Sequence, residues 1–190
     1  MDENTVRKVM TTFLKEQGHR FNPMSGAGPD ILKEDGTAIE IKGSRVLTKT
    51  LVQLTKYAFT HSNLELALPY DALKLDFIYG LWVIEHAIAN RTVGRERRVG
   101  VYIVGKIELP KVEEGTYGVF QFNSVTELLD RINGDLQYSA SLPYDTPTAE
   151  AIGRTSKLTL ELNERIKDWL KTQCIETSMS YKVKFQDAHT

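Results

Sequence analysis

The apolar positions of the first 60 residues follow the period of two amphipathic helices, with a short extended stretch between them. We expect the first helix over roughly residues 4–17, where Gly18 ends the pattern, and the second over residues 48–60. Their repeating apolar positions are Val6, Val9, Met10, Phe13 and Leu14 in the first and Leu51, Leu54, Tyr57 and Ala58 in the second. A short strand over residues 20–24 and a β-hairpin around residues 34–36 are expected between the helices.

The rest of the chain alternates between strand and helix patterns. Aromatic and β-branched content favours a buried strand over residues 77–84, and one long helix over residues 72–89 is the alternative. Further strands are expected at residues 98–107, 117–122 and 181–185, and amphipathic helices at residues 125–132 and 158–170. Residues 134–155 form the expected connector. The pattern predicts a core over residues 1–133 and an extension over residues 134–190 that packs on the core or mediates dimerisation.

Composition describes an ordinary globular chain with no general affinity for polyanions. Of the 190 residues, 41% are hydrophobic and 26% are charged, and the net charge is −1, so a nucleic acid would have to be held by a local basic patch. The single cysteine, Cys174, excludes a disulfide framework, a CxxC zinc site and a cysteine-held iron–sulfur cluster. There is no signal-peptide pattern, no apolar run of membrane-spanning length and no phosphate-binding loop of the GxxxxGK[ST] type. We therefore expect a cytoplasmic protein without a membrane partner or a nucleotide cofactor.

The hairpin places charged side chains where a strand would be expected to be apolar. A two-residue turn at residues 35–36 would put Asp30 on the face opposite to Glu40 and Lys42. A three-residue turn at residues 34–36, with the glycine in the left-handed region, brings all three charged side chains onto one face. The apolar pattern favours this second register, because the other face then carries Ile31, Ile39 and Ile41.

Two carboxylates on adjacent strands indicate a metal site. Asp30 and Glu40 would have Cβ atoms roughly 5 Å apart and would repel each other unless a cation lies between them. Hard oxygen ligands suit Mg²⁺ or Mn²⁺, and the backbone carbonyl of Ile41 can add a further ligand. Lys42, on the same face, can orient a water molecule or neutralise developing negative charge. These residues indicate metal-assisted phosphodiester hydrolysis, although a Glu-x-Lys pair on an edge strand is also typical of a solvated face.

Two basic clusters could bind phosphate groups. The first follows the hairpin and comprises Lys42, Arg45, Lys49 and Lys56; the second lies in a glycine-containing stretch and comprises Arg91, Arg95, Arg97 and Arg98. The alternative for the second cluster is a solubilising loop.

The charged hairpin resembles a known nuclease motif. Pro29-Asp30 followed by Glu40-Ile41-Lys42 is similar to the PD-(D/E)xK motif of the restriction-endonuclease-like nuclease superfamily. The order helix, strand, Asp-bearing strand, ExK strand, helix also resembles the core of that fold, a central mixed sheet flanked by helices, here with a C-terminal helical appendage. Ser25 resembles a feature of archaeal Holliday-junction resolvases, and the pair Gln53 and Tyr57 resembles the QxxxY motif of RecB-type nucleases.

The resemblance implies an endonuclease that hydrolyses DNA with Mg²⁺ or Mn²⁺, in a restriction, resolvase or repair setting, and often as a homodimer. It implies Asp30, Glu40 and Lys42 as catalytic residues, with Asp30, Glu40 and Ile41 on the metal. The expected substrate-binding residues are Ser25, Arg45, Lys49, Gln53, Lys56, Tyr57, Arg95, Arg97 and Arg98. Many members carry an acidic residue on the first helix, and neither Glu3 nor Glu16 is an obvious match.

Two other interpretations stay open at this point. The chain could be a nucleic-acid-binding or assembly module that uses the same fold without hydrolysis. It could also be a non-nuclease domain in which Arg91–Arg98 is a protein contact and the hairpin charges are solvated, and Asp30 and Glu40 on opposite faces of the hairpin would support this interpretation.

Overall fold

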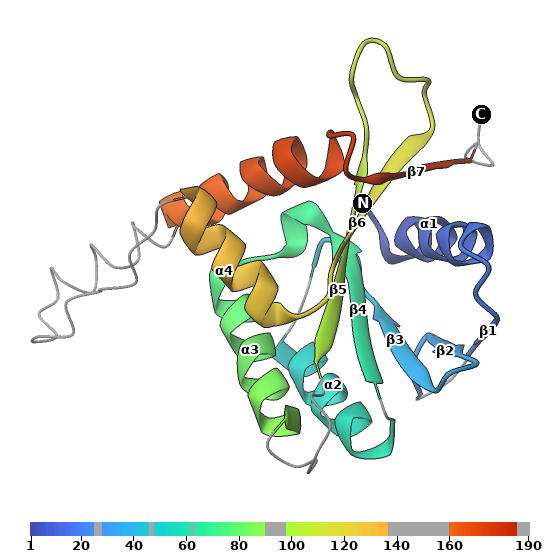
Figure 1. The fold of residues 1–190 in the computed structure, drawn as a ribbon, viewed down its shortest axis with the longest axis vertical. Coiled ribbons are helices and arrows are strands. Elements are labelled where there is room, and N and C mark those ends of the chain that lie inside the picture. Colours follow the sequence, from blue (N-terminus) through green and yellow to red (C-terminus); the bar gives the residue numbers. More distant parts are fainter. Residues whose placement is uncertain (25–27, 46–47, 62, 90–97, 137–159, 186–190) are drawn as a thin grey trace, which may run out of the picture.

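A mixed β-sheet runs through the centre of the protein in the computed structural model (Figure 1). The structure describes residues 1–24, 28–45, 48–61, 63–89, 98–136 and 160–185. Within them, seven strands follow one another across the sheet in chain order, β1 to β7. The pairs β3–β4 and β4–β5 are parallel and the other neighbours are antiparallel. The expected α/β architecture with a mixed central sheet is confirmed.

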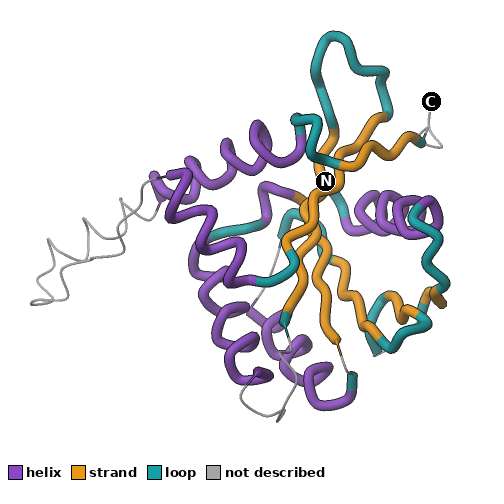
Figure 2. Tube along the Cα trace, viewed as in Figure 1, coloured by secondary structure: helices purple, strands orange, loops and turns teal. Residues whose placement is uncertain are grey.

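The strands and helices alternate along most of the chain (Figure 2). The strands are β1 (Phe21–Pro23), β2 (Ile31–Lys33), β3 (Thr37–Ile41), β4 (Asn63–Pro69), β5 (Val99–Lys106), β6 (Thr116–Phe122) and β7 (Tyr181–Lys184). The helices are α1 (Glu3–Glu16), α2 (Thr48–Thr60), α3 (Leu75–Ala89) and α4 (Val125–Leu136), with a short 3₁₀ turn η1 (Tyr70–Ala72). Residues 160–169 are also helical and continue into a π-helical segment, η2 (Leu170–Ile175).

Helices cover both faces of the sheet, and each face has its own hydrophobic cluster. In Figure 1, α1 lies on one side of the sheet and α2, α3 and α4 lie on the other. The α1 side is filled by residues that include Met10, Phe13, Ile39, Ile41 and Tyr102. The opposite side is filled by residues that include Leu54, Leu66, Ile78, Val101 and Phe122. Because both faces are covered, β4 and β5 are buried almost throughout.

The segment around residues 77–84 is a helix, so the favoured strand prediction was wrong and the alternative was correct. Buried positions in α3 recur every three or four residues, at Leu75, Ile78, Leu81, Ile84 and Ile88, whereas Tyr79 and Trp82 between them are exposed. Tyr79 and Trp82, two of the aromatic side chains that suggested a strand, therefore lie on the outer face of α3, whereas Phe77 is half-buried and packs against the core. Strand β4, which precedes it, was not predicted. In the described part of the chain, no helix is long and apolar enough to cross a bilayer.

The described C-terminal residues belong to the same sheet and hydrophobic core as the rest of the chain. Strand β7 pairs with β6, and Leu162, Ile166 and Trp169 pack in the cluster that also contains α3 and α4. The Trp169 indole donates a hydrogen bond to Asp135 Oδ2 (3.0 Å). The guanidinium of Arg131 lies over its ring at 5.4 Å. The expected connector lies mostly outside the described residues.

Candidate active site

The β2–β3 hairpin has the register that the apolar pattern favours. Ile31 pairs with Ile39, and the turn over residues 34–36 contains three residues. Gly36 has φ of 92° and donates to the Lys33 carbonyl (3.0 Å), a conformation that side chains other than glycine rarely adopt. The Asp35 carboxylate accepts the Thr37 N–H (2.9 Å). The turn chemistry therefore fixes which face each residue of β3 presents.

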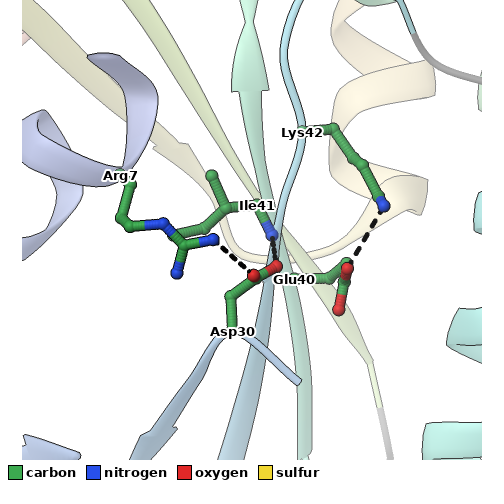
Figure 3. A network of polar contacts seen from close by, with 5 residues as sticks. All are labelled: Arg7, Asp30, Glu40, Ile41 and Lys42. Carbon is green, nitrogen blue, oxygen red and sulfur yellow. Dashed lines mark hydrogen bonds and ion pairs between the residues drawn. The ribbon is translucent and has the colours of Figure 1, made fainter. Parts of the chain in front are cut away.

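This register brings Asp30, Glu40 and Lys42 together (Figure 3). Lys42 Nζ lies 3.3 Å from Glu40 Oε1, and the Asp30 carboxylate lies close enough to Glu40 that its charge and a side-chain hydrogen bond both raise the pKa of Glu40. Asp30 Oδ2 accepts the Ile41 N–H (2.8 Å). The interpretation that placed Asp30 and Glu40 apart on opposite faces was wrong.

The peptide of Ile41 points toward Asp30 because of the way β3 pairs with β4. The Lys42 N–H donates to the Ala67 carbonyl of β4 (3.0 Å). In a parallel ladder alternate residues bond to a given neighbour, so the N–H and C=O of Ile41 face the β2 side of the strand. Its carbonyl therefore lies on the side where its N–H meets Asp30.

Burial makes Glu40 an unusual carboxyl group. Only 6% of its side chain is exposed. Desolvation raises the pKa of Glu40 from an ordinary value of 4.5 to about 7; the Asp30 charge adds to this effect and the Lys42 ammonium opposes it. At neutral pH the group is therefore poised between its protonated and ionised forms, as groups at functional sites often are.

Helix α2 adds two further side chains to this region. Tyr57 is buried, and burial followed by the neighbouring Glu40 charge raises the pKa of its hydroxyl to about 12. It therefore lies against the candidate catalytic carboxylate as a neutral hydroxyl. Gln53, one turn earlier, has a buried amide oxygen with no hydrogen-bond partner among the described residues. An unpaired buried acceptor of this kind is rare in native proteins and is open to a bound donor.

The remaining predicted substrate-binding residues lie at the surface or outside the described part of the chain. Arg45, Lys49 and Lys56 are exposed, with the two lysines on α2. Arg98 is exposed just before β5 and is engaged in an interaction. The predictions for Ser25, Arg95 and Arg97, together with the basic stretch to which the last two belong, fall outside the described residues.

Arg7 on α1 is a site residue that the sequence did not reveal. Its Nη2 lies 2.7 Å from Asp30 Oδ1, where it forms both a hydrogen bond and an ion pair (Figure 3). The helical spacing does place Arg7 at the edge of the buried stripe of α1, three residues before Met10 and seven before Leu14, so the sequence indicated that it lies near the sheet. Nothing local, however, indicated which acid it would meet.

Two other buried acids have structural roles, in contrast to Glu40. Glu85 on α3 accepts hydrogen bonds from the backbone N–H groups of Val99, Val125 and Thr126, at 2.8–3.0 Å. It thereby caps the start of α4 and ties this helix to α3 and β5. Glu65 on β4 forms an ion pair with Lys33 (2.7 Å).

The residues at the hairpin fit a divalent cation held by oxygen ligands. Glu40 Oε2 is buried without a hydrogen-bond partner among the described residues, and the two Asp30 oxygens accept from Arg7 and from the Ile41 N–H, although a carboxylate oxygen has a second lone pair that can bind an ion. No group of three or more His, Cys, Asp or Glu residues gathers within the described ranges. The available protein ligands are thus Asp30, Glu40 and the Ile41 carbonyl, a set suited to an ion such as Mg²⁺ that keeps several waters.

The likeness of this chain to known proteins is weak. No protein-family profile matches the chain, and no curated protein matches it. Among solved structures, the restriction endonuclease FokI bound to DNA has a TM-score of 0.38 and 14% identity, over 53% of this chain and 22% of the FokI chain. The chain thus spans about a fifth of the length of that protein.

Proposed function

We propose that the protein is an endonuclease of the PD-(D/E)xK type that hydrolyses DNA phosphodiester bonds with Mg²⁺ or Mn²⁺, on a restriction-endonuclease-like core. The observation that carries the proposal is the convergence of Asp30, Glu40 and Lys42 at one end of a tight hairpin, where one buried oxygen of Glu40 has no hydrogen-bond partner among the described residues. Two adjacent carboxylates, of which Glu40 is buried and Asp30 half-buried, are unfavourable unless cations neutralise them. The arrangement is therefore better suited to holding a metal than to supporting the fold.

The roles of the individual side chains follow from their positions. Asp30, Glu40 and the Ile41 carbonyl would hold the ion, which when bound supplies a nucleophilic hydroxide and stabilises charge on a phosphoryl oxygen. Lys42 would orient the attacking water and neutralise charge that develops on the phosphate. Tyr57 would hold Glu40 in place from α2, and the Gln53 amide oxygen is available to a donor on the substrate or on water.

Positive charge near the site would hold the DNA backbone. Arg45, Lys49 and Lys56 are exposed and close to the hairpin in sequence, and Lys49 and Lys56 are seven residues apart on one face of α2. Binding through such contacts weakens steeply as salt is added. Arg98, Ser25, Arg95 and Arg97 remain proposed contacts on the basis of the sequence alone.

The proposal is tested by cleavage of supercoiled plasmid and of linear and branched duplexes with Mg²⁺ or Mn²⁺. We expect Glu40→Gln and Lys42→Ala each to lower the rate by at least about 100-fold, and EDTA to abolish cleavage. Glu34→Gln is the matched control, because Glu34 is an exposed carboxylate in the same hairpin, and it should cleave like the wild type. Equal cleavage by the Glu40 and Glu34 variants would contradict the proposal.

A second candidate function is a nucleic-acid-binding or assembly module without hydrolysis. It is favoured by the Arg7–Asp30 ion pair, which already neutralises one of the two carboxylates without a metal. Under this alternative no metal-dependent cleavage occurs, and Glu40→Gln binds a duplex as tightly as the wild type in EDTA. A gel-shift titration beside the cleavage assay separates the two functions.

A further inference from the structure

Helix α1 contributes a cation, the Arg7 guanidinium, to the candidate site. A carboxylate at this position would instead help to bind a metal ion. Arg7 Nη2 and Asp30 Oδ1 are 2.7 Å apart, the distance of a charge-assisted hydrogen bond. The other Asp30 oxygen accepts the Ile41 N–H. The Asp30 side chain is 17% exposed and that of Arg7 is 33% exposed. The pair is therefore partly shielded from water, while the guanidinium can still reach solvent.

The position of Arg7 is held by contacts between the start of α1 and the residues that follow Lys42. The Ser44 N–H donates to the Met1 carbonyl (3.1 Å). Gly43 approaches the same segment so closely that an added Cβ would lie 2.9 Å from the Glu3 nitrogen. The buried stripe of α1 also packs on Ile39 and Ile41 of β3. These contacts set α1 against the end of the ExK strand, so the guanidinium is part of the site and not a chance surface pair.

We infer that Arg7 is a positioning residue that holds Asp30 in the metal-free protein and competes with the divalent cation for that carboxylate, so that Arg7 lowers the metal affinity. This inference rests on the proposed function. A cation that binds Asp30 would lie within a few ångströms of the guanidinium, and like charges at that distance repel. Arginine remains protonated at any working pH, so the repulsion does not disappear on titration.

Variants that lack the Arg7 charge should bind the divalent cation more tightly. Removing the guanidinium charge removes the repulsion and takes away the ion pair of Asp30, so that Lys42 is the cation that remains beside the two carboxylates. Both effects favour cation binding. We expect the dissociation constant for Mn²⁺ to fall by about tenfold in Arg7→Gln, which retains a neutral hydrogen-bond donor for Asp30. A residue that only supported the shape of the site would produce the opposite change, or none.

The test is isothermal titration of Mn²⁺ into the full chain without DNA, for the wild type, Arg7→Gln, Arg7→Ala and Arg7→Lys. The lysine variant keeps the charge and should bind Mn²⁺ as the wild type does. Lys8→Ala is the matched control, because Lys8 is the exposed neighbour on α1 and its loss changes the net charge equally; its affinity should stay within about twofold of the wild type. The Asp30→Asn variant identifies the fraction of the measured binding heat that comes from Mn²⁺ binding at this site.

The outcomes separate this inference from the proposed function. Tighter Mn²⁺ binding in Arg7→Gln, with Arg7→Lys and Lys8→Ala unchanged, supports the inference. Unchanged or weaker binding in Arg7→Gln, with wild-type binding that Asp30→Asn abolishes, overturns it and leaves the metal site intact. Wild-type protein that binds no Mn²⁺ at this site overturns both. Thermal unfolding in EDTA identifies any variant that is not folded. If Arg7→Ala is unfolded, the comparison of Arg7→Gln with Arg7→Lys carries the test.

Discussion

At the scale of single residues, Glu40 combines the features that distinguish a reactive group from a structural one. Both Glu40 and Glu85 are buried acids, yet Glu85 is surrounded by backbone N–H donors, whereas Glu40 has one oxygen without a partner among the described residues. Backbone donors stabilise an ionised carboxylate, and an acidic neighbour destabilises it. The environment of Glu40 therefore raises its pKa, whereas Glu85 serves as a hydrogen-bond acceptor that joins α3, β5 and α4.

The raised pKa of Glu40 predicts that the metal-free protein loses stability as the pH rises. The folded state holds the proton of Glu40 until about pH 7, whereas the unfolded chain releases it near 4.5. The stabilisation that comes from this proton is therefore complete below about pH 4.5 and is lost as the pH rises through 7. Glu40→Gln stays uncharged, so it should match the wild type at pH 4.5 and exceed its unfolding free energy at pH 8 by on the order of 1–3 kcal/mol.

Urea unfolding in EDTA over this pH range measures the difference. Glu34→Gln, in the exposed turn, serves as the control and should show no such pH dependence. A constant difference between Glu40→Gln and the wild type at every pH would contradict the explanation.

At the scale of elements, the three-residue turn of the hairpin decides whether the candidate catalytic residues come together. Its register puts Asp30, Glu40 and Lys42 together, and a shift by one residue would move every β3 side chain to the opposite face. The apolar alternation of Ile31, Ile39 and Ile41 and the positive φ of Gly36 both favour the observed register. The local signals agree, which is why this element could be predicted in detail.

Gly36→Ala should destabilise the protein by roughly 1–2 kcal/mol, because alanine is strained at φ of 92°. Gly134→Ala is the control with the opposite expected sign. Gly134 is an exposed position inside α4 with no atom within 4 Å of an added Cβ, so alanine there should stabilise by roughly 0.5–1 kcal/mol. Chemical denaturation of the two variants measures both effects. Equal stability of Gly36→Ala and the wild type would show that the turn does not need the left-handed conformation.

At the scale of the whole molecule, helices α2 and α3 expose several large apolar side chains to solvent. Their exposed side chains include Val52, Phe59, Tyr79, Trp82 and Val83, of which Phe59 is 64% and Val83 60% exposed. Of these, Phe59 of α2 and Val83 of α3 line one pocket, and exposed apolar surface of this kind often marks functional contacts. The pocket, of about 160 Å³, could receive a side chain.

The homodimer that the nuclease resemblance implies would need an apolar interface, and we expect it to form at this surface. A standard interface buries about 800 Å² per partner, of which rather more than half is apolar, so exposed side chains such as Phe59 and Val83 would form part of it. We expect the wild type to sediment as a dimer at micromolar concentration and Val83→Asp to sediment as a monomer. Leu109→Asp, at an exposed apolar position outside this surface, should remain dimeric. A monomeric wild type would exclude the dimer.

The amino-acid sequence by itself determined the features that depend on short-range pattern. The amphipathic period predicted α1 and α2, the strand pattern predicted β5 and β6, and the apolar positions on either side of the turn predicted the hairpin register. These features depend on contacts between neighbours along the chain, so the pattern contains the information needed. The candidate acids and lysine were predicted for the same reason, since they lie within thirteen positions of one another.

Only the tertiary structure decided the features that depend on distant contacts. The apolar run of α3 is compatible with strand or helix, and packing against α2 and α4 selects the helix. The pairing of Arg7 with Asp30, the proximity of Tyr57 to Glu40 and the capping of α4 by Glu85 each join separate elements. Burial, together with the neighbouring Asp30 and Lys42 charges, also sets the pKa of Glu40. Because long-range packing determines which charges meet and how much water reaches them, the sequence indicated the candidate residues and the fold determined their electrostatic state.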